Sequence, residues 1–302
     1  MKPRHFINST KRDMKHFSFF ILLFSFFTVS CSKSEIAELQ GNDETTTFTL
    51  SVNELQTPAA KAGTRATSTV TPARYVMEVW SEDGTTAEKV FEDGTKNHAE
   101  ITTGSSFTVV LDKEKAYTCL FWADDNATYD AASLKAVTLN SGKTDYTEAY
   151  YAKVAVAKGK KPAVTVSLKR AVAKITLTEN AGVNVTNNLA LKLSNIFPQF
   201  NALTGSAIGT PAKWSKTVKP AATTGIITTL YFFANSAQEL TELKFTYATE
   251  PEKTVSNVPY QQNYATNIKG EYSSLGSFTF TVTADDTWST PENEVPTEAT
   301  PN

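Results

Sequence analysis

Side chains of the kinds that carry out catalysis are scarce in this sequence of 302 residues, which has two cysteines and three histidines. Cys119 alternates with Tyr117 and Phe121 in an apolar segment. This pattern indicates a small core residue, because no neighbouring group would stabilise a thiolate there. His98 stands in a segment with the composition of a polar loop, and the other two histidines lie near the start of the chain. One internal histidine cannot build a common zinc site, and no G-x-S-x-G nucleophile motif occurs.

The acidic residues suggest a second kind of chemistry. Asp124 and Asp125 precede Asn126, and clustered oxygen atoms of this kind can bind calcium. The segment lacks the turn glycine and the spaced oxygen ligands of a calcium loop, which favours a solvated loop. No pair of carboxylates stands apart from the other loop charges as the pair of a hydrolase would. The sequence therefore predicts a protein without enzymatic activity, metal or cofactor.

An apolar run over residues 17–29 follows Lys15 and is closed by Ser30 and Cys31. The run is shorter than the roughly 20 residues that a membrane-spanning helix needs. A small residue followed by cysteine after such a run is typical of a lipoprotein signal peptide. We therefore expect residues 1–30 to be removed and Cys31 to carry lipid, palmitate included, as the first residue. An uncleaved membrane anchor is the alternative.

Loss of the signal peptide makes the chain more acidic. The segment holds five of the 29 Lys and Arg residues and one of the 31 Asp and Glu residues, so the remainder has a formal net charge of −6. No basic patch remains for phosphate backbones, which argues against nucleic acid as a partner. The polar residues 31–45 are expected to tether the fold to the outer membrane. Met14 directly precedes the apolar run and is an alternative start of the chain.

Alternating apolar residues predict β-strands along the rest of the chain. Phe48, Leu50 and Val52 form the first such pattern, over residues 46–53. The polar segment from 58 to 72, with a proline at each end, predicts an exposed loop that a protease can reach. Further strand patterns recur up to Val282, and no stretch of twelve residues has a helical stripe. The predicted fold class is therefore all-β, with strands at the spacing of β-sandwiches.

The apolar phase reverses within residues 164–178. Up to Leu168 the apolar residues occupy even positions, and from Ala171 to Leu177 they occupy odd positions. Successive side chains of a strand point to opposite faces, so one unbroken strand would expose half of this set. A bend or bulge at Lys169–Arg170 would instead carry the chain from one core into a second.

This reversal predicts two tandem β-sandwich domains, each with its own core. The first covers residues 46–169 and the second covers residues 170–283. The tail, residues 284–302, is polar and rich in proline, which predicts disorder. The length left after the signal peptide suits two domains of ordinary size.

Several short motifs, taken in their order along the chain, resemble those of the Bacteroidales-type fimbrillins, the lipoprotein subunits of type V pili. The motifs are the lipoprotein site, the first strand, Thr-Arg-Ala at 64–66, FWAD at 121–124, LKRAVAKITL at 168–177 and VPYQQNYATNIKGEY at 258–272. The resemblance implies two transthyretin-like domains and export as an outer-membrane lipoprotein. It also implies that an arginine-specific protease cuts between Arg65 and Ala66, which detaches residues 46–53 together with the lipid. A strand from another fimbrial subunit would then fill the open groove.

The resemblance predicts a structural or adhesive subunit at the cell surface or in a fimbrium. Its partners would be other fimbrial subunits and a ligand on a host or bacterial surface. The alternative for Arg65 is an exposed loop arginine without a role, since Lys61 and Arg74 show that basic residues are common nearby.

Two further alternatives concern assembly. Shaft subunits of such pili carry a C-terminal donor strand, and here no apolar alternation follows Val282, which predicts a position at an end of the fibre, such as the tip. The alternative is that residues 276–282 leave the chain's own sheet and serve as the donor strand, which would allow a position in the shaft. The rival function is a surface lipoprotein that captures glycans through exposed aromatic residues without polymerising. The chain has four tryptophans, of which two lie in strand patterns that indicate core and so weaken this alternative; they are Trp80, Trp122, Trp214 and Trp288.

Overall fold

The computed structural model describes residues 43–51, 71–92, 94–159, 163–180, 185–219, 225–273, 280–285 and 297–298. Every regular element within these ranges is a β-strand, as the sequence predicted. Among the same residues, no helix is long and apolar enough to cross a membrane.

The first ten described strands build the first sandwich and part of a connecting sheet. They are β1 (Asp43–Ser51), β2 (Arg74–Ser81), β3 (His98–Ile101), β4 (Ser106–Asp112), β5 (Tyr117–Asp124), β6 (Tyr129–Asp130), β7 (Val137–Leu139), β8 (Tyr150–Val156), β9 (Val164–Ser167) and β10 (Lys169–Arg170). The two sheets of this sandwich have the strand orders β4-β1-β9 and β10-β8-β5-β2-β3.

The remaining strands build the second sandwich and the rest of the connecting sheet. They are β11 (Val172–Glu179), β12 (Leu189–Ile196), β13 (Gln199–Asn201), β14 (Ser206–Ile208), β15 (Ala212–Val218), β16 (Ile226–Phe233), β17 (Glu239–Tyr247), β18 (Lys253–Tyr260), β19 (Ala265–Gly270), β20 (Phe280–Asp285) and β21 (Thr297–Glu298). The two sheets of this sandwich have the orders β16-β11-β19-β20-β21 and β15-β12-β17-β18.

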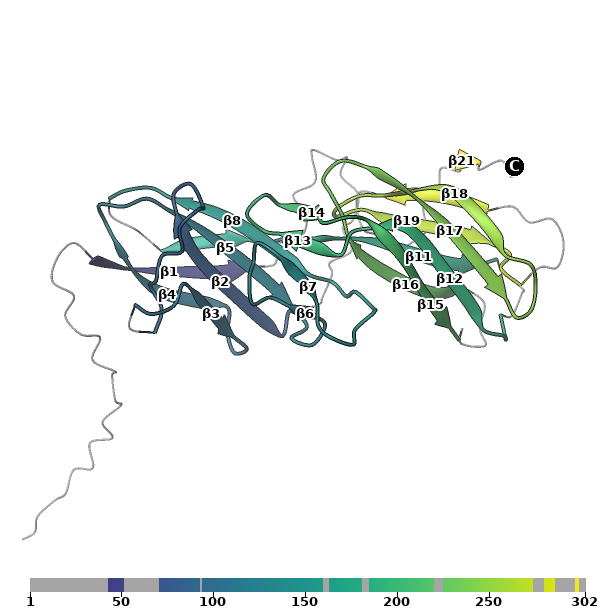
Figure 1. Ribbon diagram of the computed structural model, residues 1–302, viewed down its shortest axis with the longest axis horizontal. Helices are drawn as coiled ribbons and strands as arrows, with labels where there is room; N and C mark the ends of the chain where they lie inside the picture. The colour runs from purple at the N-terminus through teal and green to yellow at the C-terminus, as the bar shows by residue number, and fades with distance from the viewer. Residues whose placement is uncertain are drawn as a thin grey trace, which may run out of the picture. The chain divides into compact units, whose positions relative to one another are not determined.

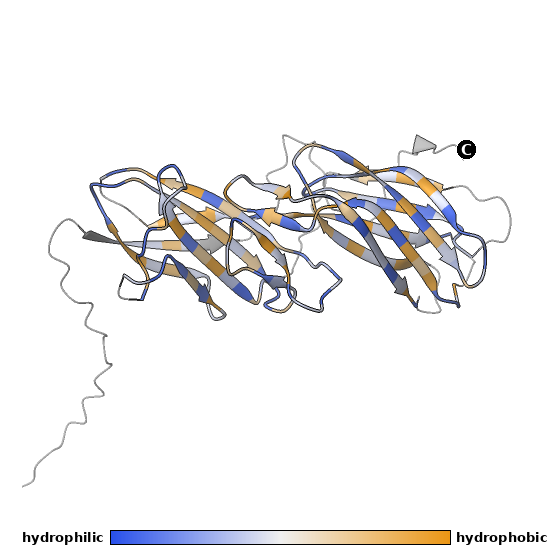
Figure 2. Ribbon diagram, viewed as in Figure 1, coloured by the Kyte–Doolittle hydropathy of each residue, from blue (hydrophilic) through white to orange (hydrophobic). Residues whose placement is uncertain are grey.

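Each sandwich encloses an apolar core whose residues alternate along the strands. The first core includes Phe48, Met77, Phe107 and Phe121. The second core includes residues of β11, β12, β16, β17 and β20. Hydrophobic and hydrophilic residues alternate along many strands in Figure 2, as expected where one face of a sheet is buried.

The strand β5 is buried along its whole length because it separates two apolar clusters. Cys119 and Phe121 face the first core, whereas Leu120 and Trp122 belong to a separate cluster. We call this the bridging cluster, and it consists of Val76, Leu120, Trp122, Tyr129, Ala131, Leu134, Val137, Ala149, Ala171, Val172, Phe200, Ala202, Ala207, Phe233 and Ala265. Burial on both faces explains why apolar residues occupy both faces of residues 117–122.

A small sheet covers part of the bridging cluster. Its order is β14-β13-β7-β6, and β7 pairs with β13, with Val137 opposite Phe200. The segment after β5 forms β6 and β7, joined by a turn in which the amide of Ala136 donates to the carbonyl of Ser133.

The phase reversal in the sequence marks the passage between the two cores. Val166 and Leu168 lie in the first core, Ala171 and Val172 lie in the bridging cluster, and Ile175 lies in the second core. The strand is interrupted at Leu168 and again at Ala171, on either side of β10. The location of a domain boundary at residues 169 and 170 stays a prediction.

The buried arginine of this joint is held from both sides. Arg170 is 6% exposed, its Nε lies 3.9 Å from the carboxylate of Glu148, and its Nη1 donates to Asn263 at 3.3 Å. Its guanidinium also lies over the ring of Tyr150, 5.6 Å from the ring centroid. These contacts compensate the burial of a charge at this position.

The tail is more ordered than the sequence predicted. β20 continues past Val282 to Asp285, and Thr297–Glu298 pairs with its outer edge as β21. The other residues from 286 to the end lie outside the described ranges.

The bridging cluster predicts that the two sandwiches lose stability together. Phe233 of β16 packs against Trp122 and Tyr129 of the first half, with ring centroids 6.2 and 5.4 Å apart. We expect Phe233→Leu to cost about 1–2 kcal/mol of unfolding free energy and to raise amide hydrogen exchange in both β5 and β17. The matched change Phe245→Leu, in the second core, should raise exchange mainly in the second sandwich. Unchanged exchange in β5 of Phe233→Leu would instead support two independent cores.

Candidate strand-exchange groove

The strand β1 lies between two neighbours in its sheet (Figure 1). It pairs antiparallel with β4, where Phe48 faces Phe107, and parallel with β9, where Phe48 faces Val164. Both edges of β1 therefore use backbone hydrogen-bonding groups that would otherwise need water. Removal of β1 would open a slot with β4 on one side and β9 on the other.

The first strand of the second sandwich has the same neighbours in the same directions. β11 pairs antiparallel with β16 and parallel with β19, as β1 does with β4 and β9. The two strands differ in their connections to the rest of the chain. β11 continues from the joint, whereas the described residues stop after β1 at Ser51 and resume at Thr71. A cut in that interval would leave β1 attached to its sandwich by noncovalent contacts alone.

The side chains of β1 show what an occupant of this slot must supply. Phe48 is fully buried, with its ring centroid 5.5 Å from that of Phe121, and Thr46 is 1% exposed. Thr45 and Thr49 are exposed on the other face. Burial of a phenylalanine side chain stabilises a fold by about 1.5–3 kcal/mol. The slot thus has one deep place for an aromatic ring and, two residues earlier, a place for a small β-branched side chain.

The outward face of β1 contributes little to its retention. The hydroxyl groups of Thr47 and Thr108 are 3.5 Å apart, and Ser106 Oγ donates to Thr49 Oγ1 at 3.3 Å. All of these contacts are exposed, where water competes for the same groups. The apolar face and the two backbone ladders therefore hold the strand.

The first strand after this interval begins with a buried arginine. Arg74 is 8% exposed, and its Nε donates to Asp124 Oδ1 at 2.9 Å. Its Nη2 donates to the second carboxylate oxygen and, at 2.8 Å, to the carbonyl of Tyr129, while Glu100 lies 3.4 Å from Nη1. Burial would lower the pKa of Arg74, but the hydrogen bonds and charges of Asp124 and Glu100 outweigh it and raise that pKa. The pair fixes the start of β2 to the end of β5.

Asp124 also organises its own strand end. It is 1% exposed and accepts hydrogen bonds from the indole nitrogen of Trp122 and the amide of Asn126, both at 2.7 Å. The prediction of a solvated loop is therefore wrong for Asp124, because its carboxylate neutralises Arg74 inside the fold. The FWAD motif thus places a buried carboxylate where β5 ends.

The prediction of an exposed loop residue holds for Asp125. Its carboxylate accepts from the amides of Ala127 and Thr128, at 3.0 and 2.9 Å. Burial raises the pKa of Asp125, yet these hydrogen bonds and one from the Thr128 hydroxyl lower it overall. Within the described ranges, no group of three or more His, Cys, Asp and Glu side chains could hold a metal ion.

The three residues predicted for lipidation and processing lie outside the described residues; these are Cys31, Arg65 and Ala66. The structure corrects the start of the first strand, because β1 begins at Asp43 and so includes the last three residues of the predicted tether. Cys119 is a buried core residue outside any disulfide, as predicted. His98 is the first residue of β3 and not a loop residue, and its Nδ1 lies 3.5 Å from Glu78 Oε1.

The described tryptophans do not form an aromatic platform for sugars. Trp122 is fully buried. Trp80 is half-buried, and the ammonium of Lys135 lies 3.1 Å from its ring centroid. Trp214 is half-buried, and its indole nitrogen donates to the carbonyl of Thr144 at 2.8 Å. Trp288 lies outside the described residues.

Sequence reasoning missed the Arg74–Asp124 pair, although one signal for it was present. Asp124 ends a strand whose remaining residues are all apolar or small. A carboxylate in such a place needs a cationic partner. The partner itself is 50 residues away in the sequence, so its identity required the fold.

Comparison with family models shows where the chain belongs. Residues 39–300 match the model of a family of unknown function, DUF6562. The chain is a member of that family. For this DUF6562 protein, comparison with curated proteins gives no match.

Several solved structures are similar to the DUF6562 chain. A candidate cell adhesion protein from Bacteroides ovatus ATCC 8483 is similar at 17% identity and a TM-score of 0.51, over 82% of this chain and 99% of that chain. Candidate polysaccharide-binding proteins (DUF1812) from Bacteroides thetaiotaomicron VPI-5482 are similar at 12% identity and a TM-score of 0.50, over 80% of this chain and 95% of that chain. The fimbrial tip protein Mfa3 from Porphyromonas gingivalis, truncated at its C-terminus, has 12% identity and a TM-score of 0.48, over 81% of this chain and 99% of that chain.

Proposed function

We propose that this chain is a structural and adhesive subunit of a fimbrium, exported as a lipoprotein on Cys31 and assembled by strand exchange after a cut at Arg65. The observation that carries the proposal is the position of β1, central in its sheet and bound through one apolar face and two backbone ladders. An extended segment that leaves such a place exposes unpaired strand edges, which another strand can fill by β-augmentation. The fold shared with a candidate cell adhesion protein agrees with a role at the cell surface.

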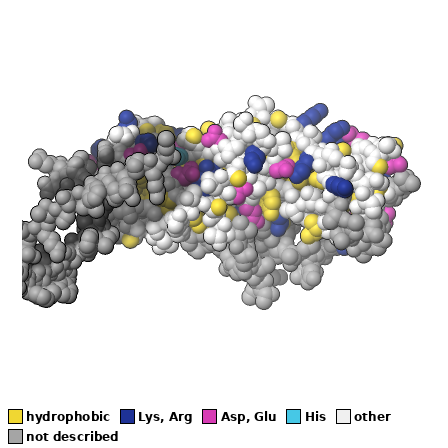
Figure 3. All heavy atoms as spheres, turned by 90° about the horizontal axis from the view of Figure 1, so that it is seen from below, with side chains coloured by type: hydrophobic (Ala, Val, Ile, Leu, Met, Phe, Trp, Pro, Cys, Tyr) yellow, Lys and Arg dark blue, Asp and Glu magenta, His cyan; other side chains and the backbone are white. Residues whose placement is uncertain are grey.

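The described surface offers little else for subunit contact. On the face in Figure 3, hydrophobic side chains are scattered among charged and polar ones. Among the described residues, the large hydrophobic side chains that are exposed are Ile226 and Leu240. Isolated residues of this kind are ordinary surface features and do not make a docking patch. The groove of β1 is therefore the feature best suited to bind another subunit.

We expect an arginine-specific protease to cut the folded chain after Arg65 and to leave Arg74 intact. Arg74 is inaccessible because its guanidinium is buried against Asp124, whereas Arg65 stands in a polar segment between two prolines. N-terminal sequencing and intact mass should show Ala66 as the new first residue. Arg65→Gln is the matched control and should resist the protease. Equal cutting after Arg74 and Arg65 would contradict the proposed processing site.

Strand exchange is tested on the cut protein with a synthetic peptide. A labelled peptide that copies residues 43–53 should displace the cleaved strand from the slot and remain bound during gel filtration, but should not bind the uncut protein. A peptide of the same composition in scrambled order is the control. Failure of the copied peptide to bind the cut protein would overturn assembly through this groove.

The placement of β20 supports a terminal position in a fibre. Phe280 packs on Tyr272 and Phe245, with ring centroids 4.9 and 5.4 Å apart, and it covers Gly270 so closely that a methyl group there would clash. A strand held in this way is costly to donate. The cut protein incubated alone should therefore stay monomeric on non-boiled SDS gels. Ladders of SDS-resistant multimers would show that it donates a strand to its own copies.

A further inference from the structure

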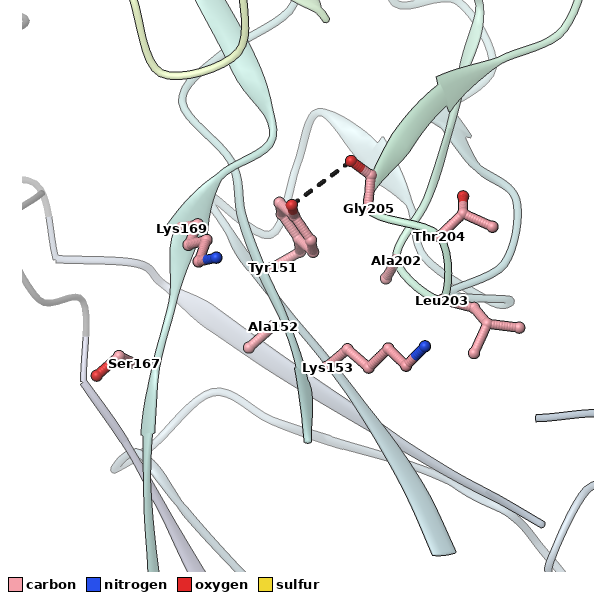
Figure 4. Close-up of a pocket in the computed structure, with 9 residues that line it drawn as sticks. All are labelled: Tyr151, Ala152, Lys153, Ser167, Lys169, Ala202, Leu203, Thr204 and Gly205. Carbon is pink, nitrogen blue, oxygen red and sulfur yellow. Dashed lines mark hydrogen bonds between the residues drawn. The ribbon is translucent and has the colours of Figure 1, made fainter. Parts of the chain in front are cut away.

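A pocket of about 260 Å³ lies beside the joint between the two cores and is open to solvent. Figure 4 shows the three segments that form it: β8, the end of β9 with the start of β10, and the turn from β13 to β14. The lining side chains on which the argument depends are Tyr151, Lys153, Lys169, Leu203 and Thr204. The pocket adjoins the slot of β1 at Ser167, which pairs with Ser51, but the proposed assembly does not account for the pocket.

The pairing of strands places two lysines on one wall. Lys169 of β10 is directly opposite Tyr151 of β8, so their side chains stand on the same face of the sheet. Lys153 lies two residues further along β8 and therefore points to that face as well. In the part of the chain that the structure describes, neither lysine forms an ion pair, and no carboxylate lines the pocket.

The turn from β13 to β14 forms the opposite wall, and packing against Tyr151 fixes its position. The ring of Tyr151 meets that of Phe200 edge to face, with centroids 4.8 Å apart, and its hydroxyl donates to the carbonyl of Gly205 at 3.5 Å. Gly205 has a φ of +68°, and a Cβ there would come within 2.8 Å of the Tyr151 hydroxyl. Glycine at this turn therefore leaves room for the tyrosine, and the tyrosine does not need to move for a ligand to enter.

We propose that this pocket binds a carboxylate-bearing sugar, as one unit of an acidic polysaccharide. Two ammonium groups beside a pocket that no carboxylate lines select an anion. The hydroxyl groups of Tyr151 and Thr204 match the hydroxyl groups of a sugar ring, while the Tyr151 ring and Leu203 supply the apolar contact that a sugar face needs. The volume exceeds what an inorganic anion fills and is below the usual range for drug-sized ligands, which suits a single ring. The open side lets the polysaccharide continue into solvent.

The test uses the intact, uncut chain, so that it does not depend on strand exchange. Isothermal titration with a glucuronate-containing hyaluronan tetrasaccharide and with N-acetylneuraminyl-lactose should show saturable binding to at least one, whereas the neutral sugar chitotetraose should not bind. Replacing both lysines, Lys153→Gln with Lys169→Gln, should weaken binding by about 10-fold or more, the effect expected for loss of charged hydrogen bonds. The matched control replaces Lys113 and Lys143 by Gln, which removes two exposed charges elsewhere and should leave binding unchanged.

A second variant separates the pocket's shape from its charge. Gly205→Ala should displace Tyr151 and weaken the same binding while the unfolding transition shows that the protein is folded. Three results would each overturn the proposal: no binding of either acidic sugar, equal binding in the lysine double variant, or complete displacement of the sugar by equimolar sulfate. The strand-exchange experiments have a separate readout, so failure here leaves the proposed assembly standing.

Discussion

Asp124→Ala will lower the free energy of unfolding by about 3–5 kcal/mol, the usual cost of breaking a buried ion pair by removing one partner. The change leaves the guanidinium of Arg74 without its two strongest acceptor contacts and removes the acceptor of the Trp122 indole nitrogen. Neither group can turn to water, because Arg74 is 8% exposed and Trp122 is fully buried. Urea unfolding followed by tryptophan fluorescence measures the loss.

Two variants test whether the buried charge explains this loss. Asp125→Ala removes the neighbouring carboxylate, which is exposed and only orders a turn, and should cost about 0.5–1.5 kcal/mol. Arg74→Met combined with Asp124→Leu removes both charges and should recover much of the stability lost in Asp124→Ala. A double variant that is as unstable as Asp124→Ala would show that packing, and not the orphaned charge, sets the cost.

The same variant links stability to processing. Once Asp124 is absent, the start of β2 is held less firmly, and Arg74 should become a second cleavage site for an arginine-specific protease. A cut there would remove the first residue of β2, which belongs to the other sheet of the first sandwich. The buried pair therefore gives the proposed processing its selectivity for Arg65, which no property of the loop alone would provide.

The sequence was sufficient to predict the strands whose apolar residues alternate. Phe107, Val109 and Leu111 occupy every second position and are buried in β4, and the phase reversal between Leu168 and Ala171 coincides with the passage between cores. Patterns of this kind are local, because each residue's burial follows from the direction of its own side chain along the strand. The fold class followed from them directly.

Features that join distant segments were not predicted. The pairing of β7 with β13 and the packing of Phe233 against Trp122 link the two halves, yet each strand pattern is satisfied without them. The pocket at Lys153 and Lys169 depends on a turn from the second half, so the place of Lys169 at the predicted bend did not show that it lines a pocket with Lys153. These contacts follow from which segments the fold brings together, and the residue types alone do not show it.

Phe48→Ala will destabilise the uncut protein by about 3–5 kcal/mol, since it removes a fully buried ring from the middle of the first core. The cavity would face Phe121 and Phe107, which belong to the strands on either side of the core and cannot both move into it. Thr49→Ala, on the exposed face of the same strand, is the control and should change stability by less than about 0.5 kcal/mol. Thermal and urea unfolding of the three proteins measure the difference.

The groove predicts that the same ring governs strand exchange. A peptide that copies residues 43–53 with alanine in place of Phe48 keeps every backbone hydrogen bond to β4 and β9 but leaves the deep site empty. It should bind the cut protein at least about 100-fold more weakly than the native copy, because a loss of about 3 kcal/mol in the slot corresponds to more than two powers of ten in affinity. A peptide with alanine in place of Thr49 should bind like the native copy. Equal binding of all three peptides would mean that the backbone ladders alone hold a donor strand, and the search for a partner subunit should then not require an aromatic residue at the matching position.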